Sequence, residues 1–239
     1  MAHDNFCIRT QYIARSTALT HEGTSGETYW TAARIRAADT YQWGVYALAE
    51  RELRRRAART VVDVGCGPAP KLAALQKRNP DVSFIGIDQG SAVTYCRGHY
   101  QWGDWLEEDL ANPKQTPSDI QGDVVICADV IEHVLDPDVL LDYLKQHVTP
   151  CGLLIISTPD RDLLRGPNCT QSPNPQHVRE WNGEEFKRYL QSRGLRVTRQ
   201  IRQLPIRLRL GRPLLDELIL RAVRGQPLRY NQVCLAEVS

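Results

Sequence analysis

Short apolar runs alternate with amphipathic stretches along most of this chain. The first run, RTVVDVG at 59–65, is followed by a helical pattern in KLAALQKRN and by a second run, VSFIGID, at 82–88. Strands that are covered on both faces of a sheet carry nearly continuous apolar residues. The pattern therefore predicts two parallel strands joined by a helix, in a βαβ unit that ends at Asp88.

The alternation continues toward the end of the sequence. An irregular strand is predicted around 101–110, followed by GDVVICADV at 122–130, a helix at 136–148 and GLLIISTP at 152–159. A helix that ends at Gly194 precedes two last strands, LRVTRQI and NQVCLAEV. This order is typical of a doubly wound α/β fold, and we expect a Rossmann-like, seven-stranded, mostly parallel sheet with helices on both faces.

Three segments depart from the alternation. Residues 1–44 are predicted to form an N-terminal cap over a core at 45–200, with Asp39 as the N-cap of a helix that reaches Arg59. Residues 160–180 are expected to form a long loop, too polar for the core. Residues 201–228 are an insertion or lid before the last strand at 229–239; we favour packing on the domain itself, with a dimer contact or a membrane-surface helix as alternatives. Residues 1–239 are predicted to form a single domain.

Composition narrows the class of protein. With 239 residues and 42% hydrophobic content, the chain can bury the core of an ordinary globular domain. No apolar run is long enough to cross a membrane and MAHDNFCIRT lacks an apolar leader, so we expect a cytoplasmic protein. The seven cysteines show no CxxC spacing, which argues against zinc and against a disulfide framework. Clusters of basic residues at 51–59 and 193–212 suit either an anionic substrate or a solvated face.

The first strand ends in a glycine pair, within VVDVGCGPAP at 61–70. Gly65 and Gly67 allow a tight turn and the close approach of a ligand, because glycine lacks a Cβ. Asp88 ends the next strand, where an acidic residue can accept hydrogen bonds from ribose hydroxyls. The dinucleotide spacing lacks its third glycine and no GxxxxGK[ST] loop is present, so we predict a ribose ligand without a pyrophosphate.

VVDVGCGPAP, IGID and DVVICADVIEHVLDP follow one another in a specific order. Through them the region from about Thr60 to Pro159 resembles the class I S-adenosylmethionine-dependent methyltransferases. The resemblance implies an enzyme with S-adenosylmethionine as its cofactor. It assigns the ribose hydroxyls to Asp88 and the adenine amino group to Asp109, for which a helix cap or a surface acid is the structural alternative. The other cofactor residues implied are Asp63, Gly65, Gly67, Ala128 and Asp129.

Methyl transfer depends mainly on holding the nucleophile in line with the methyl carbon. A hydroxyl nucleophile also needs a proton acceptor, whereas an amine needs only to be bound uncharged. His133, beyond the fourth strand, and His177, in the exposed loop after the fifth, are the candidate catalytic bases, and a structural role is the alternative for each. Our leading hypothesis is O-methylation of a hydroxyl on a sugar or small natural product, in secondary metabolism.

Two further resemblances concern the same region. IEHV and HVREW resemble the terminal-nucleotide 2′-O-methyltransferases of small RNAs, which implies a divalent metal on Asp129, Glu132, His133 and His177. We do not favour a metal or a nucleic-acid partner, because Asp129 is shorter than the glutamate it replaces and no RNA-binding module is present. HVREW with STPDRDLLRG also resembles methyltransferases of bacterial surface sugars and other secondary products, whose acceptor is a hydroxyl.

Aromatic residues of the cap and arginines beyond the fifth strand are the candidates for acceptor binding. Tyr29 and Trp30, with Trp43, suit an aromatic wall in the cap, and core packing is their alternative. Arg161, Arg165 and Arg179 could bind a phosphate or carboxylate on a small-molecule acceptor. The alternative for these arginines is that they only keep the surface soluble. The alternative functions are metal-assisted 2′-O-methylation of RNA 3′ ends, N-methylation of a small molecule or peptide, and a non-catalytic role as a cofactor-binding partner protein. The oligomeric state is open, and a homodimer could form through the insertion.

Overall fold

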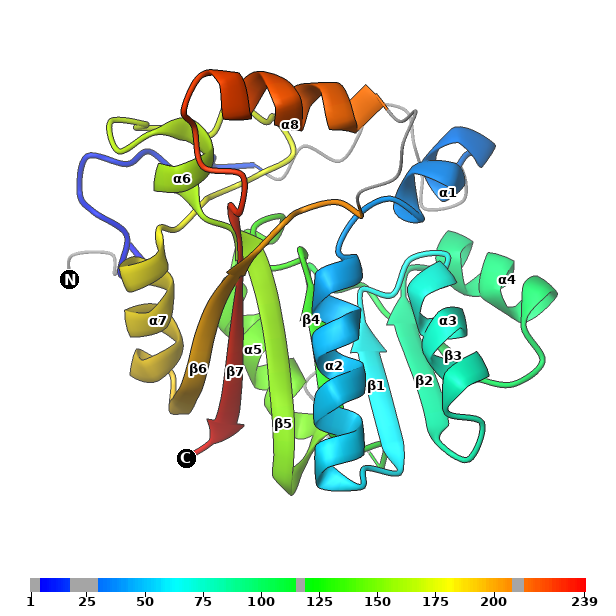
Figure 1. Cartoon of the computed structure of the whole chain (residues 1–239). Helices are drawn as coiled ribbons and strands as arrows, with labels where there is room; N and C mark the ends of the chain where they lie inside the picture. Colours follow the sequence, from blue (N-terminus) through cyan, green and yellow to red (C-terminus); the bar gives the residue numbers. More distant parts are fainter. Residues whose placement is uncertain (1–4, 18–29, 115–118, 208–212) are drawn as a thin grey trace.

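The computed structural model of the chain describes residues 5–17, 30–114, 119–207 and 213–239. A seven-stranded sheet lies at its centre in the order β3-β2-β1-β4-β5-β7-β6 (Figure 1). Only β7 runs antiparallel to its neighbours, β5 and β6. The predicted fold class is therefore confirmed. The strands are β1 (Thr60–Val64), β2 (Ser83–Asp88), β3 (Asp104–Glu107), β4 (Gly122–Ala128), β5 (Val148–Pro159), β6 (Leu195–Gln203) and β7 (Asn231–Val238).

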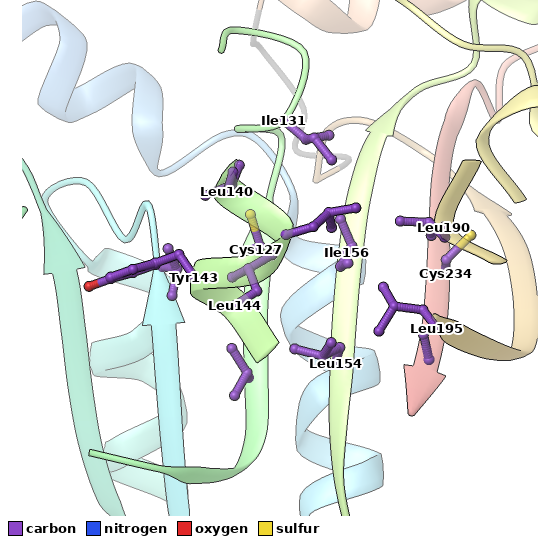
Figure 2. Close-up of a cluster of buried hydrophobic side chains, with 14 of the residues drawn as sticks. Cys127, Ile131, Leu140, Tyr143, Leu144, Leu154, Ile156, Leu190, Leu195 and Cys234 are labelled. Carbon is purple, nitrogen blue, oxygen red and sulfur yellow. The ribbon is translucent and has the colours of Figure 1, made fainter. Parts of the chain in front are cut away.

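Helices cover both faces of the sheet. Because successive strand residues point to opposite faces, Val61 packs in the apolar cluster under α2, α3 and α4, and Val62 packs in the cluster under α5 and α7. Figure 2 shows part of the second cluster, with Leu140 and Leu144 of α5 facing the strands. These helices are α2 (Trp43–Arg56), α3 (Pro70–Arg78), α4 (Gly90–His99), α5 (Pro137–Gln146) and α7 (Gly183–Ser192).

Three other helices, α1 (Ala32–Ala38), α6 (Arg161–Arg165) and α8 (Pro213–Val223), lie beyond the carboxyl ends of the parallel strands (Figure 1). Arg221 of α8 donates hydrogen bonds to the carbonyl oxygens of Leu163 (2.9 Å) and Leu164 (3.3 Å) in α6. The described part of the insertion therefore contacts α6 of this same chain. No helix among the described residues has the length and apolar character needed to cross a membrane.

The predicted helix start at Asp39 is wrong. The chain leaves α1 at Ala38 and enters α2 only at Trp43, after Gln42 adopts a left-handed conformation with φ 63°. Between the two helices, Tyr41 forms an antiparallel bridge with Ile206, just beyond β6. This long-range pairing interrupts the helix that the local pattern had predicted.

The prediction that 160–180 is too polar for the core is also wrong. The side chain of Arg161 is fully buried and forms an ion pair with Glu185 at 2.7 Å. Glu180 is buried as well, and its carboxylate accepts hydrogen bonds from other side chains of the same segment. Polar groups can occupy a protein interior when they satisfy one another in this way.

Candidate functional site

The glycine turn after β1 has an unusual backbone. Gly65 and Gly67 have φ angles of +83° and +57°, in a region that other residues rarely adopt. A Cβ on Gly65 would lie 2.3 Å from a methyl carbon of Val130, and a Cβ on Gly67 would lie 2.9 Å from the ring of Trp30. Both positions therefore exclude a side chain, and Trp30 from the N-terminal region packs directly against the turn.

Asp88 holds this turn from the end of β2. The Gly67 N–H donates to Asp88 Oδ2 at 2.7 Å, and the Gln89 N–H donates to Oδ1 at 2.8 Å. Burial raises the pKa of the Asp88 carboxyl to about 6, although the two N–H groups act in the opposite direction. A carboxylate oxygen can accept more than one hydrogen bond, so Asp88 is able to receive a pair of ribose hydroxyls.

Asp63 near the end of β1 is a second buried carboxyl group. Tyr46 donates its phenolic hydrogen bond to Asp63 Oδ2 at 2.7 Å, while Oδ1 has no hydrogen-bond partner among the described residues. Burial raises the pKa of Asp63 to about 7. A buried oxygen without a partner costs about 1–3 kcal/mol, so a cationic ligand group at Oδ1 would stabilise the charged carboxylate.

Ala128 and Asp129 lie at the end of β4. The Asp129 carboxylate accepts hydrogen bonds from the Ser157 hydroxyl (2.5 Å) and the Asn231 amide (3.2 and 3.3 Å). The Ala128 carbonyl accepts one from the Gln42 amide at 3.3 Å. Six of the predicted cofactor residues thus lie at the carboxyl ends of the adjacent strands β2, β1 and β4: Asp63, Gly65, Gly67, Asp88, Ala128 and Asp129.

Asp109 follows β3 at the same edge, but its side chain is exposed. Its carboxylate accepts a hydrogen bond from the Ala111 N–H at 3.0 Å. This contact corresponds to the structural alternative, a carboxylate that caps a local turn. A role of Asp109 at the adenine amino group stays a prediction.

His133 and His177 come together although 44 positions separate them in the sequence. The Val178 N–H donates to the Glu132 carbonyl at 2.8 Å and so fixes the loop after β5 against the loop after β4. The two imidazole rings stand edge to face, with centroids 4.8 Å apart. His133 Nδ1 lies 2.9 Å from the Gln176 carbonyl oxygen, which fits an Nδ1–H donor. The expectation that His177 is exposed is wrong, since the loop folds inward and leaves it 7% accessible.

Glu180 is the partner of His177. Glu180 Oε1 lies 2.6 Å from His177 Nδ1 and also accepts hydrogen bonds from Ser172 (2.7 Å) and Arg165 (3.1 Å). Burial alone would raise the pKa of Glu180, but the hydrogen bonds from His177 and Arg165 hold it at about 2. The carboxylate is therefore charged at neutral pH and orients the imidazole so that Nε2 is left for a ligand.

Glu132 completes a three-residue group with the two histidines. One oxygen accepts a hydrogen bond from the Thr158 hydroxyl at 3.0 Å, and the other, Oε1, has no hydrogen-bond partner among the described residues and lies 4.0 Å from His133 Nε2. One ligand atom from each of the three residues lies within 4.8 Å of the others, which is a spacing that could hold a metal ion. Asp129 is not in this group because its carboxylate bonds to Ser157 and Asn231. The structure thus brings together three of the four residues of the implied metal set.

The two arginines predicted to bind the acceptor contact other groups of this chain. Arg161 is engaged by Glu185, and the guanidinium of Arg179 donates to the carbonyls of Val134 (3.0 Å) and Leu135 (2.6 Å). Both arginines are buried, and burial lowers the pKa of Arg179 to about 10. These contacts give the two arginines structural roles, so we no longer place them in the acceptor site.

The two described aromatic candidates, Trp30 and Trp43, have different contacts. Trp30 lies against the glycine turn, which suits a contact with cofactor or acceptor. The Trp43 indole donates to the Asp39 carbonyl at 2.7 Å, and the guanidinium of Arg207 lies 4.7 Å from its ring centroid. Tyr29 lies outside the described residues.

Sequence reasoning missed Glu180, Tyr46 and Lys71. Glu180 stands three residues after His177 within HVRE, a spacing that could have suggested a pair. Tyr46 and Lys71 gave no signal, because each occupies an ordinary position in a helical pattern. Their nearness to Asp63 emerges only when α2 and α3 pack on the same side of β1.

Comparisons with known proteins agree with this geometry. A family model described as "Methyltransferase domain" matches residues 36–200, more than half of the chain. A protein of Mycolicibacterium smegmatis named "Probable S-adenosylmethionine-dependent methyltransferase" is 30% identical over 152 residues, which cover 62% of this chain and 56% of that protein. A ubiquinone biosynthesis O-methyltransferase of Pseudomonas paraeruginosa is 33% identical over 110 residues, covering 44% of this chain and 47% of that protein. The chain therefore spans about half the length of these curated relatives.

Solved structures show the same fold. A chain from the complex between the Haloferax volcanii Trm112 methyltransferase activator and a methyltransferase superposes with a TM-score of 0.66. The alignment covers 90% of this chain and 97% of the other at 16% sequence identity. At this identity the likeness extends to the fold alone.

Proposed function

We propose, on the premise that this chain belongs to the methyltransferase domain family of S-adenosylmethionine-dependent enzymes, that it methylates a hydroxyl group of a small molecule. S-adenosylmethionine, when bound, supplies an electrophilic methyl group. Asp88 would hold the ribose hydroxyls, Gly65 and Gly67 leave space for the ligand backbone, and Asp63 offers an unpartnered buried oxygen. These features fit the cofactor.

The observation that carries the hydroxyl proposal is the pair formed by His177 and Glu180. A hydroxyl must lose its proton as it attacks, and an imidazole whose Nδ1–H points at a carboxylate can take that proton at Nε2. The carboxylate then stabilises the imidazolium that forms, because the two charges are 2.6 Å apart in a buried setting. An amine acceptor that is bound uncharged would not require such a base.

His133, whose ring contacts that of His177, supports the same proposal. Its Nδ1 faces the Gln176 carbonyl, so its Nε2 is the nitrogen that can accept a hydrogen bond from the acceptor. Its side chain is 38% accessible, in contrast to the nearly buried His177. Because a hydroxyl has a single proton, we assign the transfer of that proton to His177 and a hydrogen bond from another polar group of the acceptor to His133.

The experiment uses a panel of sugars, phenols and amines with isotope-labelled S-adenosylmethionine, and mass spectrometry detects the methylated product. We expect product from a hydroxyl compound, and we expect His177→Gln to lower kcat by about 100-fold or more while S-adenosylhomocysteine affinity stays unchanged. Transfer only to amines would contradict the hydroxyl proposal. Equal losses of kcat and of cofactor affinity would contradict the assignment of His177 as the base.

A second candidate, metal-assisted 2′-O-methylation of RNA 3′ ends, is favoured by the grouping of Glu132, His133 and His177. Both histidines keep Nδ1 on a protein oxygen, an arrangement also common in metal ligands. We rank it second because Asp129 is engaged elsewhere. Methylation of an RNA terminal ribose that EDTA abolishes and Mn²⁺ restores would reverse this ranking.

A further inference from the structure

An open cavity of about 550 Å³ lies in the loop between α6 and His177, beyond the carboxyl ends of the parallel strands (Figure 1). Every residue that lines it belongs to the segment 165–173. This segment follows β5, whereas Asp88 ends β2, and both β1 and β4 lie between these two strands in the sheet. A ligand in the cavity would therefore lie away from the predicted ribose site and next to the loop of His177.

Arg165 links this cavity to the proposed catalytic base. It lines the cavity, and its guanidinium donates from Nε (3.3 Å) and Nη2 (3.1 Å) to the Glu180 carboxylate. Glu180 Oε1 is also the oxygen that His177 Nδ1 contacts. A guanidinium has five N–H donors, and Nη1 of Arg165 contacts no acceptor among the described residues. Because the side chain is 24% accessible, Arg165 can hold Glu180 on one edge and bind a further oxyanion at Nη1.

The surroundings of the cavity carry an excess of positive charge. The segment 165–173 contains no acidic residue. The guanidinium of Arg9 donates to two carbonyl groups of this segment, and that of Arg15 donates to a third at 2.9 Å. Neither Arg9 nor Arg15 forms an ion pair within the described part of the chain. The Glu180 carboxylate can neutralise only one of the three guanidinium groups, so the remaining charge favours an anionic ligand.

We propose that this cavity binds an oxyanion group of the acceptor, a carboxylate or a phosphate, with Arg165 as its main partner. A planar guanidinium matches either group, and the cavity volume lies within the range of about 300–1,000 Å³ that is typical of small-molecule sites. The amides of Asn168 and Gln171, which also line the cavity, add neutral hydrogen-bond donors. This inference rests on the proposed function and narrows its substrate class to hydroxy compounds that carry a negative charge.

The first test detects anion binding without methyl transfer. Side-chain Nε–H resonances of the arginines are recorded by NMR in isotope-labelled protein while inorganic phosphate or acetate is added at constant ionic strength. We expect the Arg165 resonance, assigned by its loss in Arg165→Lys, to shift with an apparent Kd about 10-fold lower than that of Arg78 for at least one of the anions. Arg78 is the matched control, because it also pairs with a glutamate, Glu50 at 2.7 Å, but lies in α3 and does not line the cavity.

The second test compares acceptors in matched pairs that differ in charge, hydroxybenzoates with their methyl esters and sugar phosphates with free sugars. In the wild type, the anionic member of one kind of pair should have a kcat/KM about 10- to 100-fold higher than the neutral member. The kind of pair that shows this preference distinguishes a carboxylate site from a phosphate site. Arg165→Gln should remove the preference by raising KM for the anionic member, and Arg165→Lys should keep part of it, because lysine retains the charge without the planar fork. Arg78→Gln should behave as wild type.

The ratio between the two members of a pair separates anion binding from a structural role. Because Arg165 also contacts Glu180, a purely structural role would lower kcat/KM for both members by the same factor. An unchanged ratio in Arg165→Gln, equal wild-type kcat/KM for both members, or an equal NMR response of Arg165 and Arg78 to both anions would overturn the proposal. Absence of transfer to any hydroxyl compound would contradict the proposed function instead, and the NMR titration would then decide whether the cavity binds an anion.

Discussion

His177 Nδ1 lies 2.6 Å from Glu180 Oε1, and the carboxylate of this pair is fully buried. The contact joins two residues of one loop, but its position depends on the neighbouring loop, because the Val178 backbone bonds to Glu132. A charged carboxylate that accepts from Nδ1 fixes the tautomer of the imidazole and leaves Nε2 to accept a proton. The pair therefore suits proton transfer more than simple packing.

The first prediction concerns the charge behind His177. Glu180→Gln should lower kcat by about 10- to 100-fold, because a neutral amide stabilises the imidazolium less well. S-adenosylhomocysteine affinity should stay within twofold of wild type, roughly the resolution of the titration. Initial rates and calorimetry measure the two quantities, with the exposed Glu184→Gln as the control. A parallel loss of cofactor affinity would indicate a structural role.

The second prediction is a pH dependence of stability in the cofactor-free protein. The pKa of Asp88 is raised from 3.8 to about 6 in the folded state, so the folded state binds its proton more tightly than the unfolded state. The resulting stability is fully present below the unfolded value and is lost as pH rises through about 6, by an amount on the order of 2–3 kcal/mol.

Urea unfolding at about pH 4.5 and about pH 7 measures this loss in the wild type and in Asp88→Asn. The difference between the two pH values should be smaller in the variant, because asparagine does not titrate. Identical differences in both proteins would mean that Asp88 has its ordinary pKa in the folded state. S-adenosylhomocysteine binding by the variant should weaken, which links the titrating group to the ribose site.

The third prediction separates backbone strain from side-chain overlap at the glycine turn. Gly194→Ala places a residue at φ +78° where a Cβ meets no atom within 4 Å, so it should cost about 1 kcal/mol. Gly65→Ala adds overlap with Val130 and should cost about 2–4 kcal/mol. Adding Val130→Ala to Gly65→Ala should recover part of the difference. Urea unfolding of the wild type and the three variants measures these costs. Equal costs for Gly194→Ala and Gly65→Ala would contradict an overlap at Gly65.

The fourth prediction tests the structural role of Arg161. Arg161→Met should reduce the free energy of unfolding by about 3–5 kcal/mol, because it leaves the buried Glu185 carboxylate without its cation. Combining it with Glu185→Met should restore part of that loss. The exposed Arg188→Met is the control. An unchanged unfolding free energy together with a raised KM for an anionic acceptor would instead support the anion-binding role first predicted for Arg161.

The sequence by itself determined the sheet and the glycine turn. Apolar runs of strand length that alternate with amphipathic stretches are typical of a sheet covered by helices on both faces, so their order along the chain predicted the mostly parallel sheet. The glycine turn could be predicted from Val61 to Gly67, because a positive φ directly after a strand favours glycine. The role of Asp88 could be predicted from its place at the end of the next strand. Such rules require no knowledge of distant contacts.

Only the tertiary structure decided which polar residues are buried and which of them meet. The periodicity of a sequence shows only how apolar a segment is. The burial of Arg161 depends on its ion pair with Glu185 of α7. The burial of His177 depends on the hydrogen bond between its loop and Glu132. Lys71 looked like an ordinary helix lysine until α3 packed beside Asp63. A buried charge without a partner is far more costly than a paired one, and pairing between distant residues is a property of the folded chain.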